Sequence, residues 1–406
     1  MGGKATTVLV IGGGYAGVMA ANRLLSRDDV SVTLINPRPK FVERIRLHQL
    51  AASGDPNSTV AVTDYDTVLN AGVQLVVDSV ARIDAGGRRV MLASGATLDY
   101  DYLVYAVGST GAVPASVPGA AEFAYPLSEL EQATRLRSRL ADVGRADNST
   151  SVPVRTPIVI VGGGLTGIEA AAEFAEAGRN VTLVCPVVGP SLSKAGRRSV
   201  TRRLAKLGVT IVDGPQATVT AVGPDQVALP GGATLASTVT VWTAGFGVPA
   251  LAAESGLTTD GLGRLLTDET LTSVDDDRIV ATGDAASPSG MPYRMSCQAG
   301  LPLGAQAANT VLARIAGTQP ANATVMMTGQ CISVGRGAGT VQLARKDDTP
   351  ISLYIGGRTG AFVKEQVCRY TVKWLAGEAA KPGSYKYFRG PDRTGSIAAA
   401  QAVPVR

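Results

Sequence analysis

The residues best suited to chemistry in this chain are glycines, which twice form the pattern G-x-G-x-x-G. The first copy is GGGYAG, from Gly12 to Gly17, and the second is GGGLTG, from Gly162 to Gly167. A loop of this kind between a strand and a helix brings backbone amides against the pyrophosphate of a dinucleotide. Each copy has that setting, because a β-forming run precedes it and a helical stretch and a second β-forming run follow it. The sequence therefore predicts two dinucleotide-binding units.

These loops also predict which residues contact the two cofactors. The first glycine allows a tight turn, the second lets the backbone approach phosphate, and the third lets helix and strand pack closely. The predicted cofactor-binding residues are Gly12, Gly14, Tyr15, Ala16 and Gly17 in the first loop, and Gly162, Gly164, Leu165, Thr166 and Gly167 in the second.

Both copies lack the acidic residue that commonly binds a ribose at the end of the second strand. Asn36 stands there in the first copy and Cys185 in the second. Asn36 can still donate to and accept from ribose hydroxyls. With Cys185 in place of an acidic residue, no negative charge is present there to repel the 2′-phosphate of NADPH. Lys194, Arg197 and Arg198 could pair with such a phosphate, or could form a solvated helix face. The sequence therefore leaves both NADH and NADPH open as the coenzyme, NAD(P)H.

Composition bounds the class of protein. The chain has 406 residues, of which 45% are apolar and 17% charged, and this length predicts two or three domains of about 150 residues. Its net charge of +5 comes from dispersed basic residues, which excludes a nucleic-acid-binding signature. One histidine, His48, excludes histidine-rich metal sites, so we expect no metal centre. Four widely spaced cysteines exclude a CxxC redox pair and favour an intracellular setting.

Three further segments complete an ordered set of five elements. They are the segment YLVYAVG at 102–108, the segment VWTAG at 241–245 and the segment RIVATGDAA at 278–286. With them, nearly the whole chain resembles the two-dinucleotide flavoprotein reductases. Within that group it resembles the type II NADH:quinone dehydrogenases and the apoptosis-inducing-factor-like oxidoreductases.

The resemblance implies an α/β fold of the glutathione-reductase type, with two Rossmann-like dinucleotide-binding domains and a small α+β C-terminal domain. FAD would bind a discontinuous domain of residues 1–112 and 256–320. NAD(P)H would bind residues 113–255, and residues 321–406 would form the third domain, with a small sheet. It also implies that Gly108, Gly245, Gly283 and Asp284 bind cofactor, Asp284 at the ribityl–phosphate part of FAD. Without the resemblance, Asp284 predicts a helix N-cap after a buried strand.

The reaction implied is transfer of a hydride from NAD(P)H to FAD, followed by electron transfer to a quinone or quinone-like small molecule. Disulfide reductases need a cysteine pair that this sequence lacks, and Cys331 is predicted to be a buried structural thiol. Two alternatives stay open. One is reduction of a protein acceptor such as a ferredoxin, and the other is a non-enzymatic regulatory flavoprotein.

Two side chains are predicted to be catalytic. Glu169 matches a glutamate that type II NADH dehydrogenases carry where nicotinamide and flavin meet, and it could orient the carboxamide or relay protons. Its alternative role is a first-turn carboxylate stabilised by the helix dipole. Gln298 resembles a glutamine placed against the quinone, but Pro302 replaces a second glutamine and is expected to change the helix start.

The segment FVERIRLHQLAASG at 41–54 follows the first nucleotide-binding unit, where the resemblance places the isoalloxazine. His48 could attach the flavin covalently, line its pocket or lie on the surface. Arg44 is expected to contact flavin or substrate.

Membrane contact depends on residues 361–375. Their apolar members recur at helical spacing, which predicts either a core-facing amphipathic helix or a membrane-surface helix with a basic rim. These members are Phe362, Val363, Val367, Tyr370 and Trp374. No apolar run approaches the roughly 20 residues that span a bilayer. We therefore expect a cytoplasmic protein, either free or peripheral at the inner face of the membrane, and a homodimer stays open.

Overall fold

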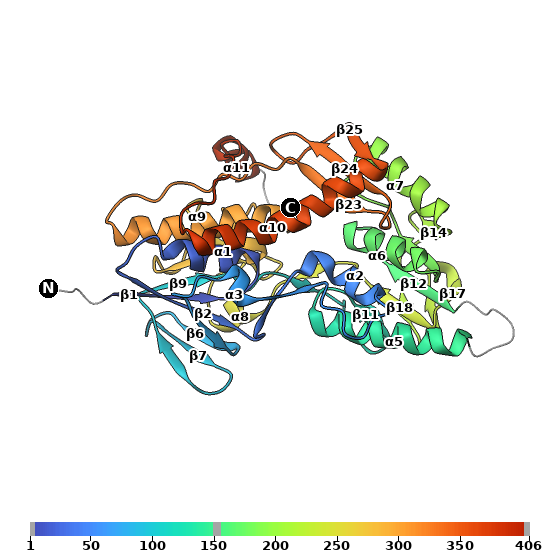
Figure 1. Ribbon diagram of the computed structural model, residues 1–406, viewed down its shortest axis with the longest axis horizontal. Coiled ribbons are helices and arrows are strands. Elements are labelled where there is room, and N and C mark those ends of the chain that lie inside the picture. Colours follow the sequence, from blue (N-terminus) through green and yellow to red (C-terminus); the bar gives the residue numbers. More distant parts are fainter. Residues whose placement is uncertain (1–4, 149–155, 402–406) are drawn as a thin grey trace.

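The computed structural model describes residues 5–148 and 156–401, arranged as two lobes around two five-stranded sheets (Figure 1). The first lobe is on the left of Figure 1 and the second on the right. The C-terminal segment lies along the top of both. The predicted α/β fold with two parallel sheets is confirmed.

The sheet of the first lobe is parallel, in the order β21-β9-β1-β2-β5. Its strands are β1 (Thr6–Ile11), β2 (Val30–Asn36), β5 (Gln74–Val77), β9 (Tyr102–Tyr105) and β21 (Ile279–Ala281). Helices α1 (Tyr15–Leu24) and α9 (Cys297–Ile315) pack against each other over one face. The small sheet of β6 (Val80–Asp84), β7 (Arg89–Leu92) and β8 (Thr97–Asp99) adjoins the apolar cluster on the other face.

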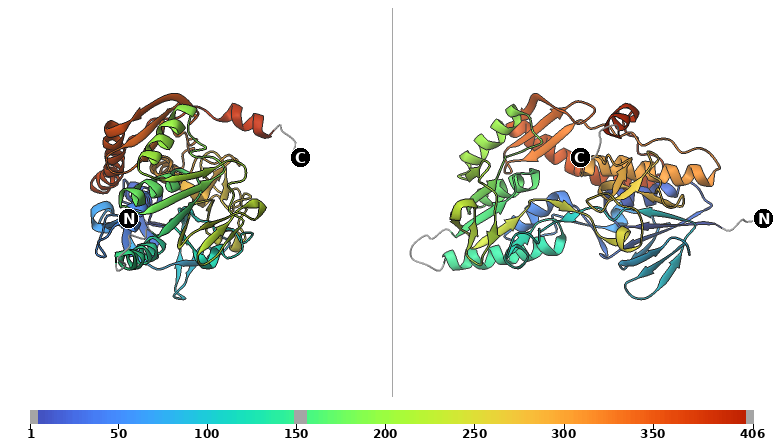
Figure 2. Two further views of the ribbon diagram at one scale, coloured as in Figure 1. Left: turned by 90° about the vertical axis from the view of Figure 1, so that its right-hand side faces the viewer. Right: turned by 180° about the vertical axis from the view of Figure 1, so that it is seen from behind.

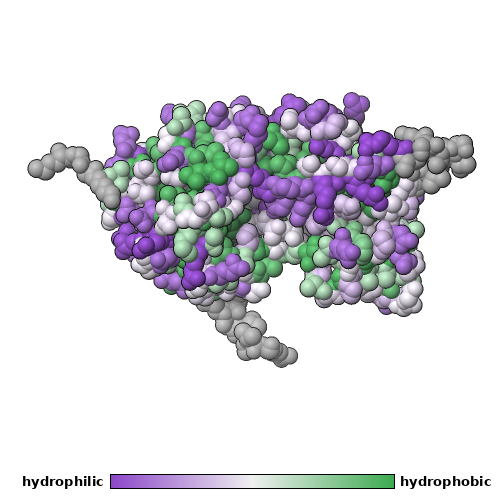
Figure 3. Space-filling model, turned by 90° about the horizontal axis from the view of Figure 1, so that it is seen from below, coloured by the Kyte–Doolittle hydropathy of each residue, from purple (hydrophilic) through white to green (hydrophobic). Residues whose placement is uncertain are grey.

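The sheet of the second lobe repeats this plan, in the order β11-β18-β12-β13-β14. Its strands are β11 (Ala124–Pro126), β12 (Pro157–Val161), β13 (Asn180–Cys185), β14 (Thr210–Asp213) and β18 (Val239–Trp242). Its helices are α5 (Leu130–Asn148), α6 (Leu165–Glu176) and α7 (Lys194–Lys206). Alternate strand residues face opposite sides. One set packs under α5 and α6, and the other packs against the small sheet of β15 (Ala221–Val222), β16 (Gln226–Ala228) and β17 (Thr234–Ala236). Hydrophilic residues form a band on the face seen from below (Figure 3).

Two chain crossings join the lobes. In the crossings, β10 (Thr110–Gly111) pairs antiparallel with β19 (Phe246–Gly247). The short helix α2 (Leu47–Ala52) follows the first nucleotide-binding unit but packs against α5 and α6 of the second lobe. These contacts place residues near 48 at the junction between the lobes.

The C-terminal segment contains an antiparallel sheet and a long helix. The sheet consists of β23 (Gly329–Ser333), β24 (Gly339–Ala344) and β25 (Pro350–Gly356), which confirms the strands expected there. Helix α10 (Gly357–Ala380) follows directly and packs on α1, α3 (Tyr65–Val68), β23 and β24. Leu375 joins the core of the first lobe, and Ile332 and Val334 join that of the second. This segment therefore buttresses both lobes, as Figure 2 shows from behind.

The remaining elements are short. They are β3 (Lys40–Val42), η1 (Arg44–Arg46), β4 (Val62–Asp64), α3 (Tyr65–Val68), α4 (Ala120–Phe123), β15 (Ala221–Val222), β16 (Gln226–Ala228), η2 (Pro230–Gly232), β17 (Thr234–Ala236), α8 (Leu251–Glu254), β20 (Leu265–Thr267), η3 (Gly283–Ala285), β22 (Ala286–Pro288) and α11 (Thr394–Gln401).

The core-facing side of α10 differs from the one expected. Phe362, Tyr370 and Trp374 are 64%, 42% and 43% exposed, and the other two members of the apolar stripe are half-buried. Of the two alternatives for this stripe, the core-facing one is therefore wrong. The buried side carries small and polar residues instead: Gly360, Cys368, Thr371, Leu375, Glu378 and Ala379. A buried ion pair of 2.7 Å from Arg23 Nε to Glu378 Oε1 helps to fix this orientation. Within residues 5–148 and 156–401, no helix is both long and apolar enough to span a bilayer.

Candidate functional site

The first glycine loop has the geometry that a dinucleotide requires. Gly12 has a φ of +104°, which residues with a side chain rarely adopt, and a Cβ on Gly17 would lie 1.8 Å from the Gly12 carbonyl oxygen. Gly14 caps α1 without a side-chain hydrogen bond, and a Cβ there would meet nothing within 4 Å. Tyr15 and Ala16 therefore begin a helix whose N-cap residue, Gly14, leaves room for another group, which fits a pyrophosphate.

The second loop repeats this geometry. Gly162 has a φ of +119°, and a Cβ on Gly167 would lie 1.9 Å from the Gly162 carbonyl oxygen. Gly164 also caps its helix without a side chain and faces open space, and Leu165 and Thr166 begin α6. The residues in both loops therefore fit a dinucleotide.

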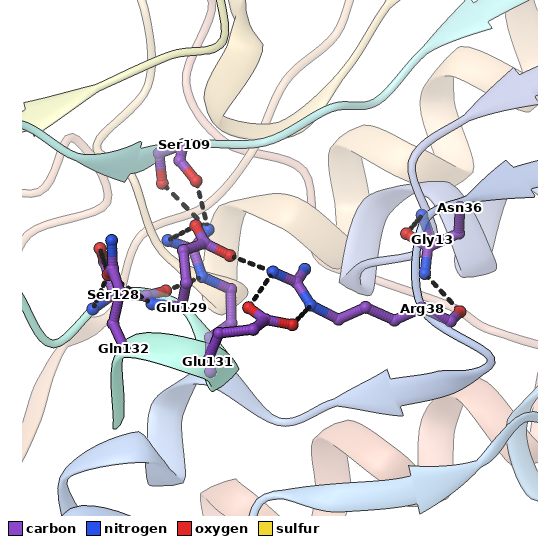
Figure 4. Close-up of polar contacts among 9 residues, drawn as sticks. Gly13, Asn36, Arg38, Ser109, Ser128, Glu129, Glu131 and Gln132 are labelled. Atoms are coloured by element: carbon purple, nitrogen blue, oxygen red, sulfur yellow. Dashed lines mark hydrogen bonds and ion pairs between the residues drawn. The ribbon is translucent and has the colours of Figure 1, made fainter. Parts of the chain in front are cut away.

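Asn36 ends β2 as predicted, but its carboxamide binds the chain itself (Figure 4). Its Oδ1 accepts from the Gly13 amide at 3.0 Å, and its Nδ2 donates to the Arg38 carbonyl at 2.8 Å. The Tyr65 hydroxyl donates to the Gly13 carbonyl at 2.8 Å. Asn36 therefore holds the glycine loop in place, and ribose binding by its side chain stays a prediction.

Two arginines of the first lobe, Arg38 (Figure 4) and Arg44, contact the start of α5 and the residues just before it. Arg38 donates from Nε and Nη2 to the two carboxylate oxygens of Glu131, both at 2.7 Å, and from Nη2 to Glu129 at 3.0 Å. Arg44 donates to the carbonyls of Ser109 at 2.6 Å and Ser128 at 2.9 Å. These contacts fix the start of α5 against the first lobe. The expected contact of Arg44 with flavin stays a prediction.

Asp284 lies in η3, which follows β21, and the N-cap of this turn is Thr282. The N-cap role considered for Asp284 is therefore wrong. Its Oδ2 accepts from the Ser109 hydroxyl at 2.6 Å and its Oδ1 accepts from the Ser296 amide at 3.1 Å. Gly283 has a φ of +67° and packs against Ala16, because a Cβ on it would lie 3.0 Å from that of Ala16. Asp284 is thus held beside the first glycine loop.

Gly108 and Gly245 lie just before the paired crossings β10 and β19. Their φ values are +71° and +90°, which explains the glycine at each position. A Cβ on Gly108 would lie 3.8 Å from Arg44 Nη1, so this turn adjoins the cluster around Ser109.

Glu169 is buried in a polar cluster drawn from three parts of the chain. Its Oε1 accepts from Lys364 Nζ of α10 and from the Ser333 amide of β23, both at 2.9 Å. Its Oε2 lies 3.8 Å from Nδ1 of His48 on α2. His48 is 3% exposed, and its Nε2 is buried without a hydrogen-bond partner among the described residues.

The charges in this cluster follow from burial and pairing. Burial raises the pKa of Glu169, but Lys364, His48 and the Ser333 amide outweigh burial and hold the pKa below its ordinary value. Burial lowers the pKa of Lys364, but Glu169 reverses this, so the pKa lies above its usual range. Burial lowers the pKa of His48 to about 4, with Glu169 opposing and Lys364 assisting. At neutral pH the cluster therefore contains a carboxylate, an ammonium group and a neutral imidazole.

Three of the four cysteines also lie around Lys364. Cys297, Cys331 and Cys368 are free thiols, and Lys364 Nζ donates to the Cys331 carbonyl at 3.3 Å. If deprotonated, each of the three thiolates would be close enough to interact with Lys364 and with the other sulfurs. Burial raises the pKa of each, to about 11 for Cys297. Sequence reasoning found no neighbour for Cys331, because these residues come from three distant elements. Cys185 is separate and buried at the end of β13, where a Cβ on Gly163 would lie 2.5 Å from its sulfur.

Gln298 lies in the first turn of α9, and its carboxamide is bound by the C-terminal sheet. In the orientation that satisfies both groups, it donates to the Gly329 carbonyl at 2.9 Å and accepts from the Thr328 hydroxyl at 2.8 Å. The helix begins at Cys297, where the Ser296 side chain accepts from the Ala299 amide at 3.2 Å. The expectation that Pro302 changes the helix start is wrong, since it lies inside α9. An acceptor contact of Gln298 stays a prediction.

Sequence reasoning missed the residues that pair with the predicted ones. Lys364, Ser333 and Arg38 carry the interactions of Glu169 and of the inter-lobe contact. No local signal marks Lys364, which lies among other charged residues of its segment. For Arg38, its position two residues after the end of β2 was an available signal.

Comparison with known proteins gives consistent matches. Residues 6–310 match the family described as pyridine nucleotide-disulphide oxidoreductase. An NADH dehydrogenase-like protein of Mycobacterium tuberculosis (strain CDC 1551 / Oshkosh) is 34% identical over 332 residues, covering 76% of this chain and 80% of that protein. A type II NADH:quinone oxidoreductase of Mycobacterium tuberculosis (strain ATCC 25618 / H37Rv) is 28% identical, covering 77% and 74%. The solved structure of NDH2 from Plasmodium falciparum in complex with NADH matches with a TM-score of 0.77 and 15% identity, covering 94% and 98%, and shows the fold alone.

Proposed function

We propose that this chain, which belongs to the pyridine nucleotide-disulphide oxidoreductase family, is a flavin-dependent dehydrogenase that oxidises NAD(P)H and reduces a quinone or quinone-like small molecule. The observation that carries this proposal is the pair of glycine loops. In each lobe a parallel strand leads through a glycine loop into the N-terminus of a helix. No side chain caps either helix, and the N-cap glycines, Gly14 and Gly164, leave open space beside them. The similarity to NADH dehydrogenase-like and type II NADH:quinone oxidoreductase sequences supports the choice of donor and acceptor.

The two cofactors have separate sites in this proposal. FAD binds the first lobe, from residues 1–112 and 256–320, and NAD(P)H binds the second, from residues 113–255. Bound FAD supplies the ability to accept a hydride and to release its electrons to an acceptor. The chain supplies binding and alignment: the amides at the start of α1 and α6 hold the pyrophosphates, and Asp284 holds the ribityl–phosphate part of FAD.

Glu169 is the proposed proton-handling group of the site. Its carboxylate is held by Lys364 and Ser333 through Oε1, which leaves Oε2 directed toward His48 at 3.8 Å. A carboxylate so fixed can move a proton at Oε2 while Oε1 stays bound. His48 Nε2, which is buried without a partner, is the complementary group on the side of α2.

Stopped-flow absorbance tests this function. The purified protein should hold about one FAD per chain, and NADH or NADPH should bleach it without added partners. Reoxidation should be fast with a short-chain quinone and slow with oxidised ferredoxin. A flavin that neither nicotinamide reduces would refute the dehydrogenase assignment, and preferential reoxidation by ferredoxin would refute the quinone assignment.

We also propose that α10 lies against an anionic membrane surface. Phe362, Tyr370 and Trp374 are exposed on this helix, and Arg369 and Lys373 lie on its exposed part. Exposed aromatics with a basic rim are typical of helices at the lipid interface. The protein should therefore sediment with vesicles containing phosphatidylglycerol, and high salt should release it. Replacing Phe362 and Trp374 by serine should weaken this binding, and equal binding of both proteins would contradict the assignment.

A further inference from the structure

A solvent-open cleft of about 310 Å³ lies beside the Glu169 cluster, where α2, α6 and the β23–β24 turn meet. Its wall includes Gln49 and Ser53 from the first lobe's chain, and Glu173, Glu176 and Arg336 from the other side. Gln49 follows His48 directly, and Glu173 is one helical turn from Glu169. The cleft therefore borders the same polar cluster from the solvent side.

Glu173 is as deeply buried as Glu169 on the same helix. The side chain of Glu173 is 8% exposed and that of Glu169 9%, whereas that of Glu176 is 30% exposed. Glu173 Oε1 accepts from Arg336 Nε at 2.6 Å, but the buried Oε2 has no hydrogen-bond partner among the described residues. A buried acceptor without a partner is costly, which favours a proton on this carboxyl group or a water beside it.

The charges around Glu173 favour a carboxyl group that can hold a proton. Burial raises the pKa of Glu173, Arg336 acts against burial, and the nearby carboxylates Glu176 and Glu169 raise it further, so the pKa lies above its ordinary value. The elements packed against it add few charges. From α2 the facing groups are the neutral side chain of Gln49 and, deeper, His48.

The spacing along α6 connects this group to the cluster. Side chains four residues apart on a helix lie on one face, with Cβ atoms about 5–6 Å apart. Glu173 and Glu169 have this spacing, so one water can bridge their carboxyl groups. Beyond Glu169, His48 Nδ1 lies 3.8 Å from Oε2.

We propose that this cleft is the entrance through which solvent protons reach the acceptor site, with Glu173 as the first carrier and Glu169 as the next. The proposal rests on the function proposed above. Oxidation of NAD(P)H by a quinone consumes one proton from the medium, because the hydride carries two electrons and only one of the two hydrogens of the quinol. The O–H bond of Glu173 breaks as a new O–H bond forms through water at Glu169 Oε2. From there the proton passes to the reduced acceptor, and cleft water reprotonates Glu173. No group changes oxidation state in this transfer.

The test compares two acceptors in the holoenzyme, because ferricyanide takes electrons without protons and a quinone takes both. The variant is Glu173→Gln, which keeps the size of the side chain but cannot carry the proton. The control is Glu122→Gln, at an exposed carboxylate on α4. Flavin content and the rate of flavin reduction by NAD(P)H should be unchanged in both.

Glu173→Gln should reoxidise with ferricyanide at the wild-type rate and with quinone about tenfold more slowly or worse, which is within reach of a lost proton-transfer group. The slow step should show a larger solvent isotope effect, and formate should partly restore quinone reduction in Glu173→Ala. If Glu173→Gln reduced quinone at the wild-type rate from pH 6 to 9, the proton route would be overturned, while the proposed function would stand. Equal losses with both acceptors would also overturn it, in favour of a structural role. A wild-type protein that reduces ferricyanide but no quinone would refute the proposed function, and this route with it.

Discussion

Replacing Lys364 by methionine perturbs the Glu169 cluster at its main cation. Lys364 is 13% exposed, and its Nζ lies 2.9 Å from Glu169 Oε1. Methionine keeps an unbranched side chain but removes the charge, which leaves Glu169 with the Ser333 amide and a neutral His48. Breaking a buried ion pair in this way costs about 3–5 kcal/mol. At about 2–4 °C per kcal/mol, the melting temperature should fall by roughly 6–20 °C at neutral pH.

The stabilities of the wild type and of Lys364→Met should depend on pH in opposite directions. In the wild type the pKa of Glu169 is lowered in the folded state, so its contribution to stability is present above the ordinary value and is lost as pH falls through the folded pKa. In Lys364→Met, burial dominates and the folded pKa should lie above the ordinary value of about 4.3. The variant should therefore recover part of its stability as pH falls from 8 to 5, a range in which the wild type gains nothing from Glu169.

The assay is thermal unfolding of the holoenzyme followed by flavin fluorescence, at equal flavin content and several pH values. Arg369→Met is the matched control, because Arg369 also pairs with a glutamate at 3.0 Å but is 67% exposed. That pair should contribute no more than about 1 kcal/mol. Adding Glu169→Gln to Lys364→Met should recover much of the loss, since no charge is then left unpaired. Equal, small losses in Lys364→Met and Arg369→Met would refute the assignment of a buried ion pair.

Two other substitutions test the cofactor assignments. Asp284→Ala should weaken FAD binding roughly 10- to 100-fold, the scale of a lost charge-assisted hydrogen bond. FAD retained after ultrafiltration measures this, and full retention would contradict the role of Asp284. Cys185→Glu should raise the ratio of kcat/KM for NADH over NADPH by about tenfold, because a carboxylate would bind the ribose and repel a 2′-phosphate. An unchanged ratio would place the adenosine away from the end of β13.

The features that could be predicted from sequence are those set by local rules. The glycine loops depend on backbone angles and on close approach within one β–α–β unit, so their spacing alone indicates Gly12, Gly17, Gly162 and Gly167. The ends of β2 and β13 follow from the same unit. The residue type of Asn36 also indicated a donor and an acceptor. It did not indicate that both serve the chain itself, because this depends on the positions of the Gly13 amide and the Arg38 carbonyl.

The features that escaped prediction depend on residues far apart in sequence. The apolar stripe of α10 indicated a core-facing side, yet the buried side is set by polar contacts such as Arg23 with Glu378, 355 residues away. The role of Lys364 could not be predicted for the same reason. Its neighbours along the helix do not distinguish it from exposed lysines, and its partner Glu169 lies about 200 residues earlier, on α6 of the second lobe. Helical periodicity finds a stripe but cannot tell which stripe has a buried ionic partner.

The position of β21 imposes an order on synthesis. The second lobe's sheet uses one continuous stretch of chain, so it can close as soon as β18 leaves the ribosome. The first sheet has to wait for β21, about 170 residues after its neighbour β9. At about 5–20 residues per second, that interval lasts roughly 10–35 s. During it the exposed edge of β9 is an unpaired strand in a crowded cell, and the lobe encoded first is completed last.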